Sequence, residues 1–116
     1  MRRVRNGRAQ KGNRLVSRVV NRLRVKYQPE RIVLFGSYAS GRHTEESDLD
    51  LLIIKNTRRS FFKRLYDVRR LAEPVLSGYP FDPIVLTPAE LQERLARGDQ
   101  FLQSILNKGR QVYVHG

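Results

Sequence analysis

The chain has 116 residues, which suffices for one hydrophobic core but not for a catalytic domain joined to a full substrate domain. Its composition, 40% hydrophobic and 29% charged, is typical of a globular domain and excludes a disordered chain. The lack of cysteine excludes disulfides and thiolate zinc sites, and no apolar run approaches the ~20 residues that span a bilayer. The N-terminal arginines are followed by no apolar segment of the kind that a secretory signal needs, so we expect a cytoplasmic protein.

The formal charge of +12 is concentrated at the N-terminal end, where residues 1–26 contain many Lys and Arg and no acid. Such a block is typical of contact with a polyanion, and RNA, an acidic partner protein and nucleotide phosphates are the candidates. A solubilising tail followed by a solvated helix face is the alternative, and it stays open because no aromatic residue for base stacking precedes Tyr27. Residues 1–13 have no apolar period, which predicts a flexible basic arm before a single domain at residues 14–116.

The first half of that domain predicts helix and strand in alternation. Apolar residues at three- and four-residue spacing indicate a helix that begins at Arg14 and ends before Pro29. The elements expected next are a strand at residues 31–35, a short helix at 37–39, a polar loop at 41–47 and a strand at about 49–55.

The second half continues the alternation. Phe61 and Phe62 lie on the apolar stripe of a helix, so we expect both in the core. Thr87, Pro88 and Glu90 form the sequence of a capping box with proline at the first helical position. The elements expected are a helix that ends near Pro74 and Gly78, a strand at about 81–86, helices at 88–97 and 100–106 and a last strand at 111–114. This order predicts a small layered α/β or α+β domain.

A glycine follows the first predicted strand and opens a short helix. Residues 36–41 match the G-x-x-x-x-G of a P-loop, but Arg42 and His43 stand where Lys and Ser or Thr belong, which excludes an ordinary P-loop NTPase. Gly36 and Ser37 can still hold a phosphate through the Ser37 hydroxyl and backbone N–H groups. The alternative is that Gly36 only permits a tight turn and Ser37 only caps the helix.

Asp48 and Asp50 are separated by one apolar residue at the start of an otherwise apolar strand. Side chains alternate across a strand, so both project from one face, roughly 7 Å apart along it. Desolvating a carboxylate costs several kcal/mol unless a partner or a metal compensates. The pair therefore predicts a shared cation near the phosphate site, and pairing with arginines of this basic chain is the alternative.

The motif G-S-Y-A-x-G at residues 36–41, followed by S-D-L-D-L at residues 47–51, resembles the nucleotidyltransferase superfamily with the DNA polymerase β-type palm. Within it the chain resembles the minimal nucleotidyltransferases, relatives of kanamycin nucleotidyltransferase, over about residues 14–114. Ser40 stands where many members carry Arg, although Arg42 lies two residues on. The resemblance implies a polymerase β-like palm, a mixed β-sheet flanked by helices.

The resemblance also implies a third carboxylate on a neighbouring strand, and the sequence offers Asp82. Asp48, Asp50 and Asp82 would then be the catalytic residues and would hold one or two Mg²⁺ ions. Asp82 would also be the general base for the acceptor hydroxyl. Because Pro83 cannot donate to a sheet ladder, this strand must lie at an edge or Asp82 must lie at its beginning. The alternative role for Asp82 is a strand-start residue paired with an arginine.

The remaining expectations concern substrate and partners. Gly36, Ser37 and Arg42 would bind the phosphates of ATP or another nucleoside triphosphate, with Arg42 or Lys55 adding positive charge unless both are only solvated cations. The expected reaction transfers AMP to a hydroxyl acceptor and releases pyrophosphate. The chain lacks an obvious domain that grips the acceptor, so we expect a protein partner or a homo-oligomer. Minimal nucleotidyltransferases of this kind resemble antitoxins that pair with a HEPN-type toxin. A non-catalytic module that binds nucleotide, RNA or a partner through residues 1–26 is the second hypothesis.

Overall fold

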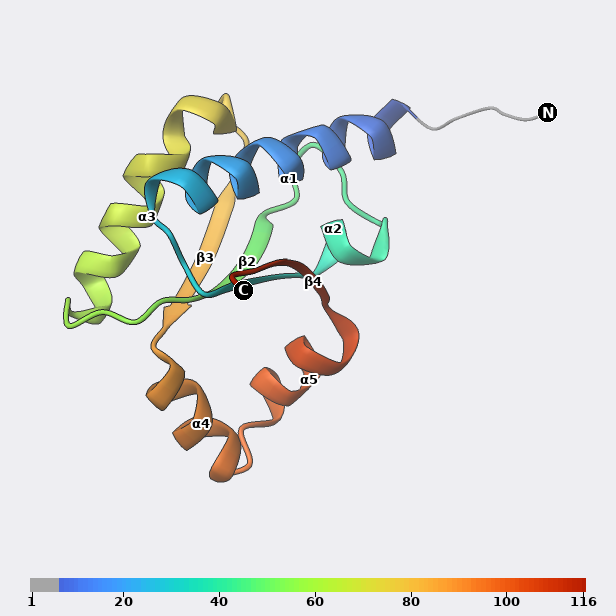
Figure 1. The fold of residues 1–116 in the computed structure, drawn as a ribbon. Coiled ribbons are helices and arrows are strands. Elements are labelled where there is room, and N and C mark those ends of the chain that lie inside the picture. The colour runs from blue at the N-terminus through green and yellow to red at the C-terminus, as the bar shows by residue number, and fades with distance from the viewer. Residues whose placement is uncertain (1–6) are drawn as a thin grey trace.

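The computed structural model describes residues 7–116, with side chains from residue 11 onward. Within this part of the chain, helices and strands alternate around one four-stranded sheet of order β3-β2-β1-β4 (Figure 1). The helices are α1 (Gly7–Lys26), α2 (Ser37–Ser40), α3 (Phe61–Leu76), α4 (Pro88–Ala96) and α5 (Gln100–Lys108). The strands are β1 (Arg31–Phe35), β2 (Leu49–Ile54), β3 (Phe81–Leu86) and β4 (Arg110–Val114).

The sheet is mixed. β1 pairs antiparallel with both β2 and β4, whereas β3 pairs parallel with β2. The parallel pair is joined by α3, because two parallel neighbours need a long crossover rather than a hairpin. The alternating and apolar patterns of the sequence therefore predicted the strands and the fold class correctly.

Helices cover both faces of the sheet. α1 and α3 pack on one face, where Leu23 and Val68 meet Leu34, Leu51 and other fully buried strand residues. α4 and α5 pack on the other face, which carries Val33, Leu52 and Leu86. Figure 1 shows α1 and α3 together above the sheet and α4 and α5 below it. β2 is apolar on both faces because it is covered on both sides.

α1 begins earlier than the sequence pattern indicates. The helix includes residues 7–13, which we expected in a flexible arm, while residues 1–6 of that arm lie outside the described residues. Within this extension Gly12 lies so close to His43 that a Cβ at this position would overlap the imidazole. α1 thus packs at Gly12 against a residue that is distant in sequence, a contact that an apolar period does not reveal. No helix among the described residues combines the length and apolarity that crossing a bilayer requires.

Phe61 and Phe62 are not core residues, contrary to the expectation. They are 44% and 79% exposed, because they occupy the first turn of α3, beyond the end of the sheet that the later turns cover. The core residues of α3 are Val68 and Ala72.

The edge strand β3 is held by two arginines of α3. Arg69 Nη1 donates to the carbonyl of Phe81 at 2.9 Å, and Arg64 Nη1 donates to the carbonyl of Val85 at 3.3 Å. Arg64 also forms a two-pronged ion pair with Glu90, with N···O distances of 2.7 and 3.1 Å. Glu90 is the last residue of the capping box predicted at the start of α4, which is present. Arg64 therefore joins α3, β3 and α4.

We expect the substitution Arg64→Ala to lower the free energy of unfolding by about 2–3 kcal/mol, because it leaves the carbonyl of Val85 and the carboxylate of Glu90 without their partner. The hydrogen bond from Arg64, more than any other contact, lowers the pKa of Glu90, so the contribution of this pair is lost as pH falls through that lowered pKa. Urea unfolding measures the change. Arg97→Ala is the matched control, since the exposed pair of Arg97 with Glu93 is worth at most about 0.5 kcal/mol. Equal losses in the two variants would contradict the structural role of Arg64.

Candidate active site

The Gly36–Ser37 turn connects β1 to α2. Gly36 has φ +73°, a conformation that favours glycine, and a Cβ here would overlap Oδ2 of Asp50. The carbonyl of Gly36 accepts from the backbone N–H groups of Ala39 at 3.1 Å and Ser40 at 3.2 Å. The Ser37 hydroxyl makes no hydrogen bond to another described residue. Gly36 thus does more than permit a turn, because it also lets the backbone approach a carboxylate.

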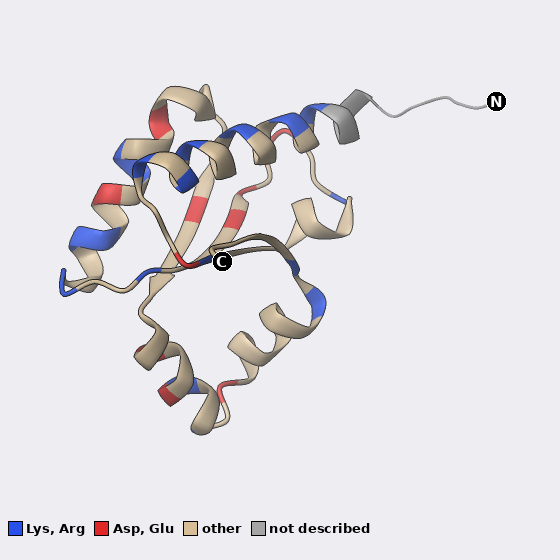
Figure 2. Cartoon of the chain, in the orientation of Figure 1, with Lys and Arg blue, Asp and Glu red and all other residues tan. Residues whose placement is uncertain are grey.

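Asp50 and Asp82 are neighbours in the parallel ladder between β2 and β3. Directly paired residues lie on the same face of a sheet, so both side chains lie on the face covered further along by α4 and α5. Figure 2 shows an acidic segment on each of these two adjacent strands. Burial raises the pKa of Asp50 from its ordinary value to about 6, and the negative charges of Asp82 and then Asp48 add to this effect. Asp50 therefore lies close enough to the other two carboxylates for their charges to raise its pKa.

The sequence predicted desolvated carboxylates, and only one of the three is partly buried. Asp50 is half-buried, but Asp48, which precedes β2, and Asp82 are exposed. No Lys or Arg among the described residues forms an ion pair with any of them, despite the charge of +12. The alternatives of arginine pairing for Asp48, Asp50 and Asp82 therefore find no support in this part of the chain. Pro83 fits as predicted, because β3 is an edge strand.

Oxygen ligands and uncompensated negative charge are what Mg²⁺ prefers, so these carboxylates fit a hard divalent cation in their chemistry. Across residues 11–116 no three His, Asp or Glu side chains are gathered closely enough to hold a metal ion as they stand. The assignment of Asp48, Asp50 and Asp82 as metal ligands accordingly stays a prediction.

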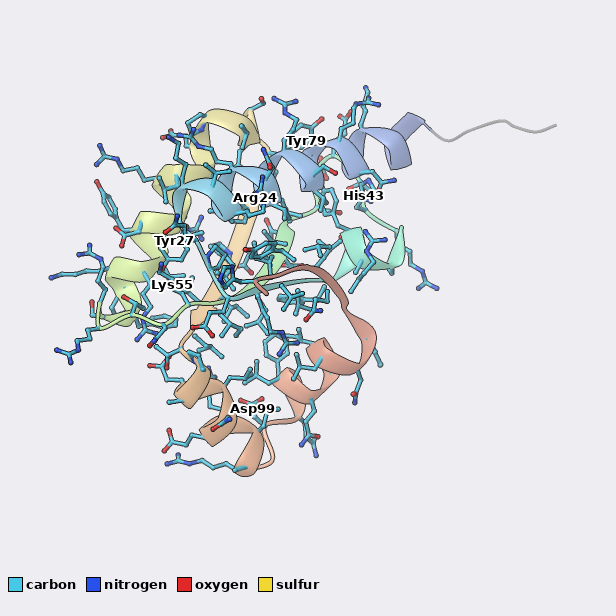
Figure 3. All side chains as sticks on the ribbon, viewed as in Figure 1. Arg24, Tyr27, His43, Lys55, Tyr79 and Asp99 are labelled. Atoms are coloured by element: carbon cyan, nitrogen blue, oxygen red, sulfur yellow. The ribbon has the colours of Figure 1, made fainter. Side chains whose placement is uncertain are left out.

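Of the two cations considered for the phosphates, only Arg42 lies near the turn. Its backbone N–H donates to the carbonyl of Ser37 at 3.0 Å, and its side chain is exposed. Lys55 follows the opposite end of β2, and its Nζ donates to the carbonyl of Tyr27 at 2.7 Å (Figure 3). The same ammonium lies 4.9 Å from the centre of the Tyr27 ring. Lys55 is therefore a structural cation at the far end of β2 from the turn, so of the two cations only Arg42 stays a candidate for the phosphates.

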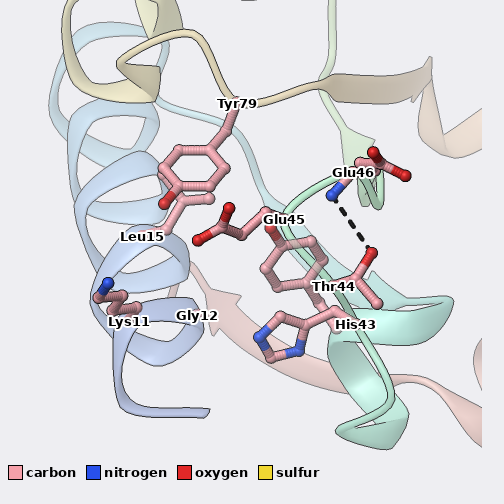
Figure 4. A pocket seen from close by; sticks show the side chains of 9 residues that line it. Lys11, Gly12, Leu15, His43, Thr44, Glu45, Glu46 and Tyr79 are labelled. Atoms are coloured by element: carbon pink, nitrogen blue, oxygen red, sulfur yellow. Dashed lines mark hydrogen bonds between the residues drawn. The ribbon is translucent and has the colours of Figure 1, made fainter. Parts of the chain in front are cut away.

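A cavity of about 600 Å³ lies beyond the start of β2 and β3, beside α1 (Figure 4). Tyr38 and His43 form one wall, with parallel rings whose centres are 4.2 Å apart. Both residues are 6% exposed, which indicates that Tyr38 packs inside the protein and does not present its ring to a ligand. Lys11, Glu45 and Tyr79 also line the cavity. Sequence reasoning missed Lys11 and Tyr79, because they come from separate elements and belong to no motif.

Comparison with known proteins agrees with this geometry. Two proteins of Methanocaldococcus jannaschii assigned as protein adenylyltransferases are 51% identical over 41 residues and 55% identical over 31 residues. These matches cover 34% and 27% of this chain and only 41% and 31% of the relatives, less than two thirds of either. A crystal structure of a nucleotidyltransferase from Sulfolobus solfataricus shares the fold, with a TM-score of 0.59 and 19% identity over 96% of this chain and 91% of that one.

The family assignment rests on a longer match. The family model described as the nucleotidyltransferase domain matches residues 16–114, which include the Gly36–Ser37 turn and all three carboxylates. The chain therefore belongs to the nucleotidyltransferase domain family.

Proposed function

We propose that the protein is a metal-dependent nucleotidyltransferase that transfers AMP from ATP to a hydroxyl group and releases pyrophosphate. The observation that carries the proposal is the position of Asp50. Its half-buried carboxylate lies against Gly36 of the phosphate-binding turn, pairs in register with Asp82 and has no cationic partner among the described side chains. A carboxylate so placed fits a divalent cation bound together with a phosphate chain.

The proposed reaction assigns a role to each of these site residues. The backbone after Gly36 and the Ser37 hydroxyl bind the β- and γ-phosphates, and the exposed guanidinium of Arg42 adds charge beside them. Asp48, Asp50 and Asp82 would hold Mg²⁺, which when bound would neutralise the charge that develops on the leaving pyrophosphate. Asp82, which is exposed and so can be reached by an acceptor, takes the hydroxyl proton. The acceptor oxygen then bonds to the α-phosphorus, and the bond from that phosphorus to the oxygen that bridges the α- and β-phosphates of ATP breaks, so that this oxygen leaves with pyrophosphate.

The acceptor that we propose is a hydroxyl of a partner protein. The relatives assigned as protein adenylyltransferases support a protein acceptor. A HEPN-type toxin encoded beside this chain is the partner to test first, with this protein as its antitoxin. A second copy of this chain in a homo-oligomer is the other candidate.

A second candidate function is RNA binding by α1. Its residues 7–26 contain no acid, and Figure 2 shows Lys and Arg along the helix. A groove of about 440 Å³ between α1 and β4 is lined by Asn13, Ser17, Asn21, Arg24, Arg110 and three valines. These polar and basic side chains suit phosphate contacts. RNA binding that is tight and steeply salt-dependent, without any label transfer, would favour this function over the enzyme.

Transfer is tested with ATP labelled on the α-phosphate, the purified chain and the co-expressed partner. We expect the label to appear on the partner in Mg²⁺, to disappear when EDTA removes the metal, and to fall at least about 10²-fold in Asp82→Asn, because that variant cannot accept the proton. Asp67→Asn is the control, since Asp67 of α3 pairs with Arg59 and has no part in the proposed reaction. Labelling that persists in EDTA or in Asp82→Asn would contradict the proposed mechanism.

A further inference from the structure

An aromatic residue lies directly opposite Asp50. Phe35 pairs with Asp50 across the antiparallel ladder of β1 and β2, so ring and carboxylate lie on the same face of the sheet. Gly36 follows at once, and its missing side chain admits the Asp50 carboxylate. Any nucleotide bound by the turn and by Asp50 is therefore adjacent to Phe35.

α5 places a second aromatic ring beside the first. The ring centres of Phe35 and Phe101 are 6.0 Å apart, and the rings meet edge to face at 84°. Leu102 and Ile105 of α5 are buried in the core, but Phe101 is 57% exposed. We call Phe35 and Phe101 the aromatic step. The ring of Phe101 packs on Phe35, the residue paired with Asp50, while more than half of the Phe101 surface stays exposed.

We propose that the aromatic step is the nucleobase subsite, in which Phe101 stacks on the base of the bound nucleoside triphosphate. This inference rests on the proposed function, because it needs a nucleotide at the carboxylates. Every base has a π-face, and stacking on an exposed phenyl ring requires no hydrogen-bond partner. The larger purine ring covers more of Phe101 than a pyrimidine does, so the ligand class is a purine nucleoside triphosphate.

A comparable aromatic pair elsewhere in the molecule gives a matched control. Phe61 and Phe62 of α3 also meet edge to face, with ring centres 5.7 Å apart, and Phe62 is 79% exposed. This pair lies on α3, which follows the C-terminal end of β2, whereas Asp50 lies near the N-terminal end of β2. The two pairs share chemistry and exposure but differ in their position relative to the carboxylates.

The test uses tryptophan fluorescence, because the chain contains no tryptophan. Phe101→Trp and Phe62→Trp are titrated with ATP and with inorganic tripolyphosphate, both in Mg²⁺. We expect ATP to quench the emission of Phe101→Trp and not that of Phe62→Trp, and tripolyphosphate to quench neither. By calorimetry, Phe101→Ala should weaken ATP binding about fivefold or more without changing the affinity for tripolyphosphate, and Phe101→Tyr should restore ATP affinity. CTP should bind more weakly than ATP to the unmodified protein but not to Phe101→Ala.

The outcomes separate this inference from the proposed function. Quenching of Phe101→Trp by ATP, in a protein that transfers no label to any partner, supports the subsite and counts against the transferase. If ATP binds by calorimetry but leaves the emission of Phe101→Trp unchanged, or if Phe101→Ala binds ATP as tightly as the unmodified protein, the subsite assignment is overturned. An unmodified protein that does not bind ATP overturns both.

Discussion

Replacing Asp50 by asparagine is expected to abolish transfer and, at the same time, to stabilise the metal-free protein. The amide removes the charge that would hold Mg²⁺, so we expect transfer to fall at least about 10³-fold. The same charge is costly without metal, because burial and the charges of Asp82 and Asp48 raise the pKa of Asp50 to about 6. After allowance for solvent screening, we expect the variant to gain about 1–2 kcal/mol at pH 8 in EDTA.

The pH dependence of stability provides a separate check on Asp50. A carboxyl group whose pKa is higher in the folded state binds more protons there than in the unfolded chain. Its favourable contribution is therefore complete below the ordinary value of 3.8 and is lost as pH rises to about 6 and beyond. We expect the metal-free protein to lose stability across this window and Asp50→Asn to lack that loss, as measured by urea unfolding in EDTA.

Asp67→Asn is the matched control for Asp50→Asn. Asp67 is paired with Arg59 at 2.6 Å, so its neutralisation removes an attractive contact and should give no gain in stability. A similar gain in both variants would show that the effect reflects overall charge and not the site. Transfer by Asp50→Asn within tenfold of the unmodified protein would remove Asp50 from the proposed mechanism.

Replacing Gly36 by alanine is expected to lower transfer at least about 10²-fold and the free energy of unfolding by about 2–3 kcal/mol. One part of the stability loss is conformational, because φ +73° with ψ −154° is a region open essentially to glycine alone and costs an L-residue about 1–3 kcal/mol. The other part is steric, because the new methyl group would overlap Oδ2 of Asp50 and must displace the carboxylate. Displacement of a proposed metal ligand accounts for the loss of transfer.

Gly98→Ala is the control for alanine at a positive φ without a steric contact. Gly98 has φ +81°, but a Cβ there meets nothing within 4 Å. This variant should therefore show only a conformational loss, about 1 kcal/mol, and keep full transfer activity. Unfolding and transfer are measured on both variants. If Gly36→Ala matched Gly98→Ala in both measurements, the close approach of Gly36 to Asp50 would have no functional role.

The sequence predicted features that depend on local chemistry or on a linear motif. The four strands follow from runs of apolar residues, the α4 capping box from Thr87 and Glu90, and the edge position of β3 from Pro83. The spacing of the turn and the acids also indicates the family. In these cases the information lies within a few residues, where sterics and hydrogen bonding act directly.

The features that were missed depend on contacts between distant segments. Gly12 of α1 packs against the imidazole of His43. The structural role of Lys55 depends on the hydrogen bond that it donates to the carbonyl of Tyr27. Phe62 has the spacing of a core residue, but it lies in the first turn of α3 and is 79% exposed. Its exposure depends on where along its length α3 packs on the sheet. Periodicity indicates which residues share a face, but it does not indicate how far the covering layer extends.

The outer edge of β3 has a consequence for association. The N–H of Leu49 donates to the carbonyl of Pro80, so alternate peptide groups of β3 point to β2 and those of Phe81, Pro83 and Val85 point outward. Two of these outward carbonyls already accept from Arg69 and Arg64, and Pro83 has no N–H to offer. A foreign strand beside Asp82 therefore finds only part of a ladder to extend, which disfavours strand addition and edge-to-edge aggregation at this edge. A partner protein that approaches Asp82 is thus favoured to bind through side chains rather than by adding a strand.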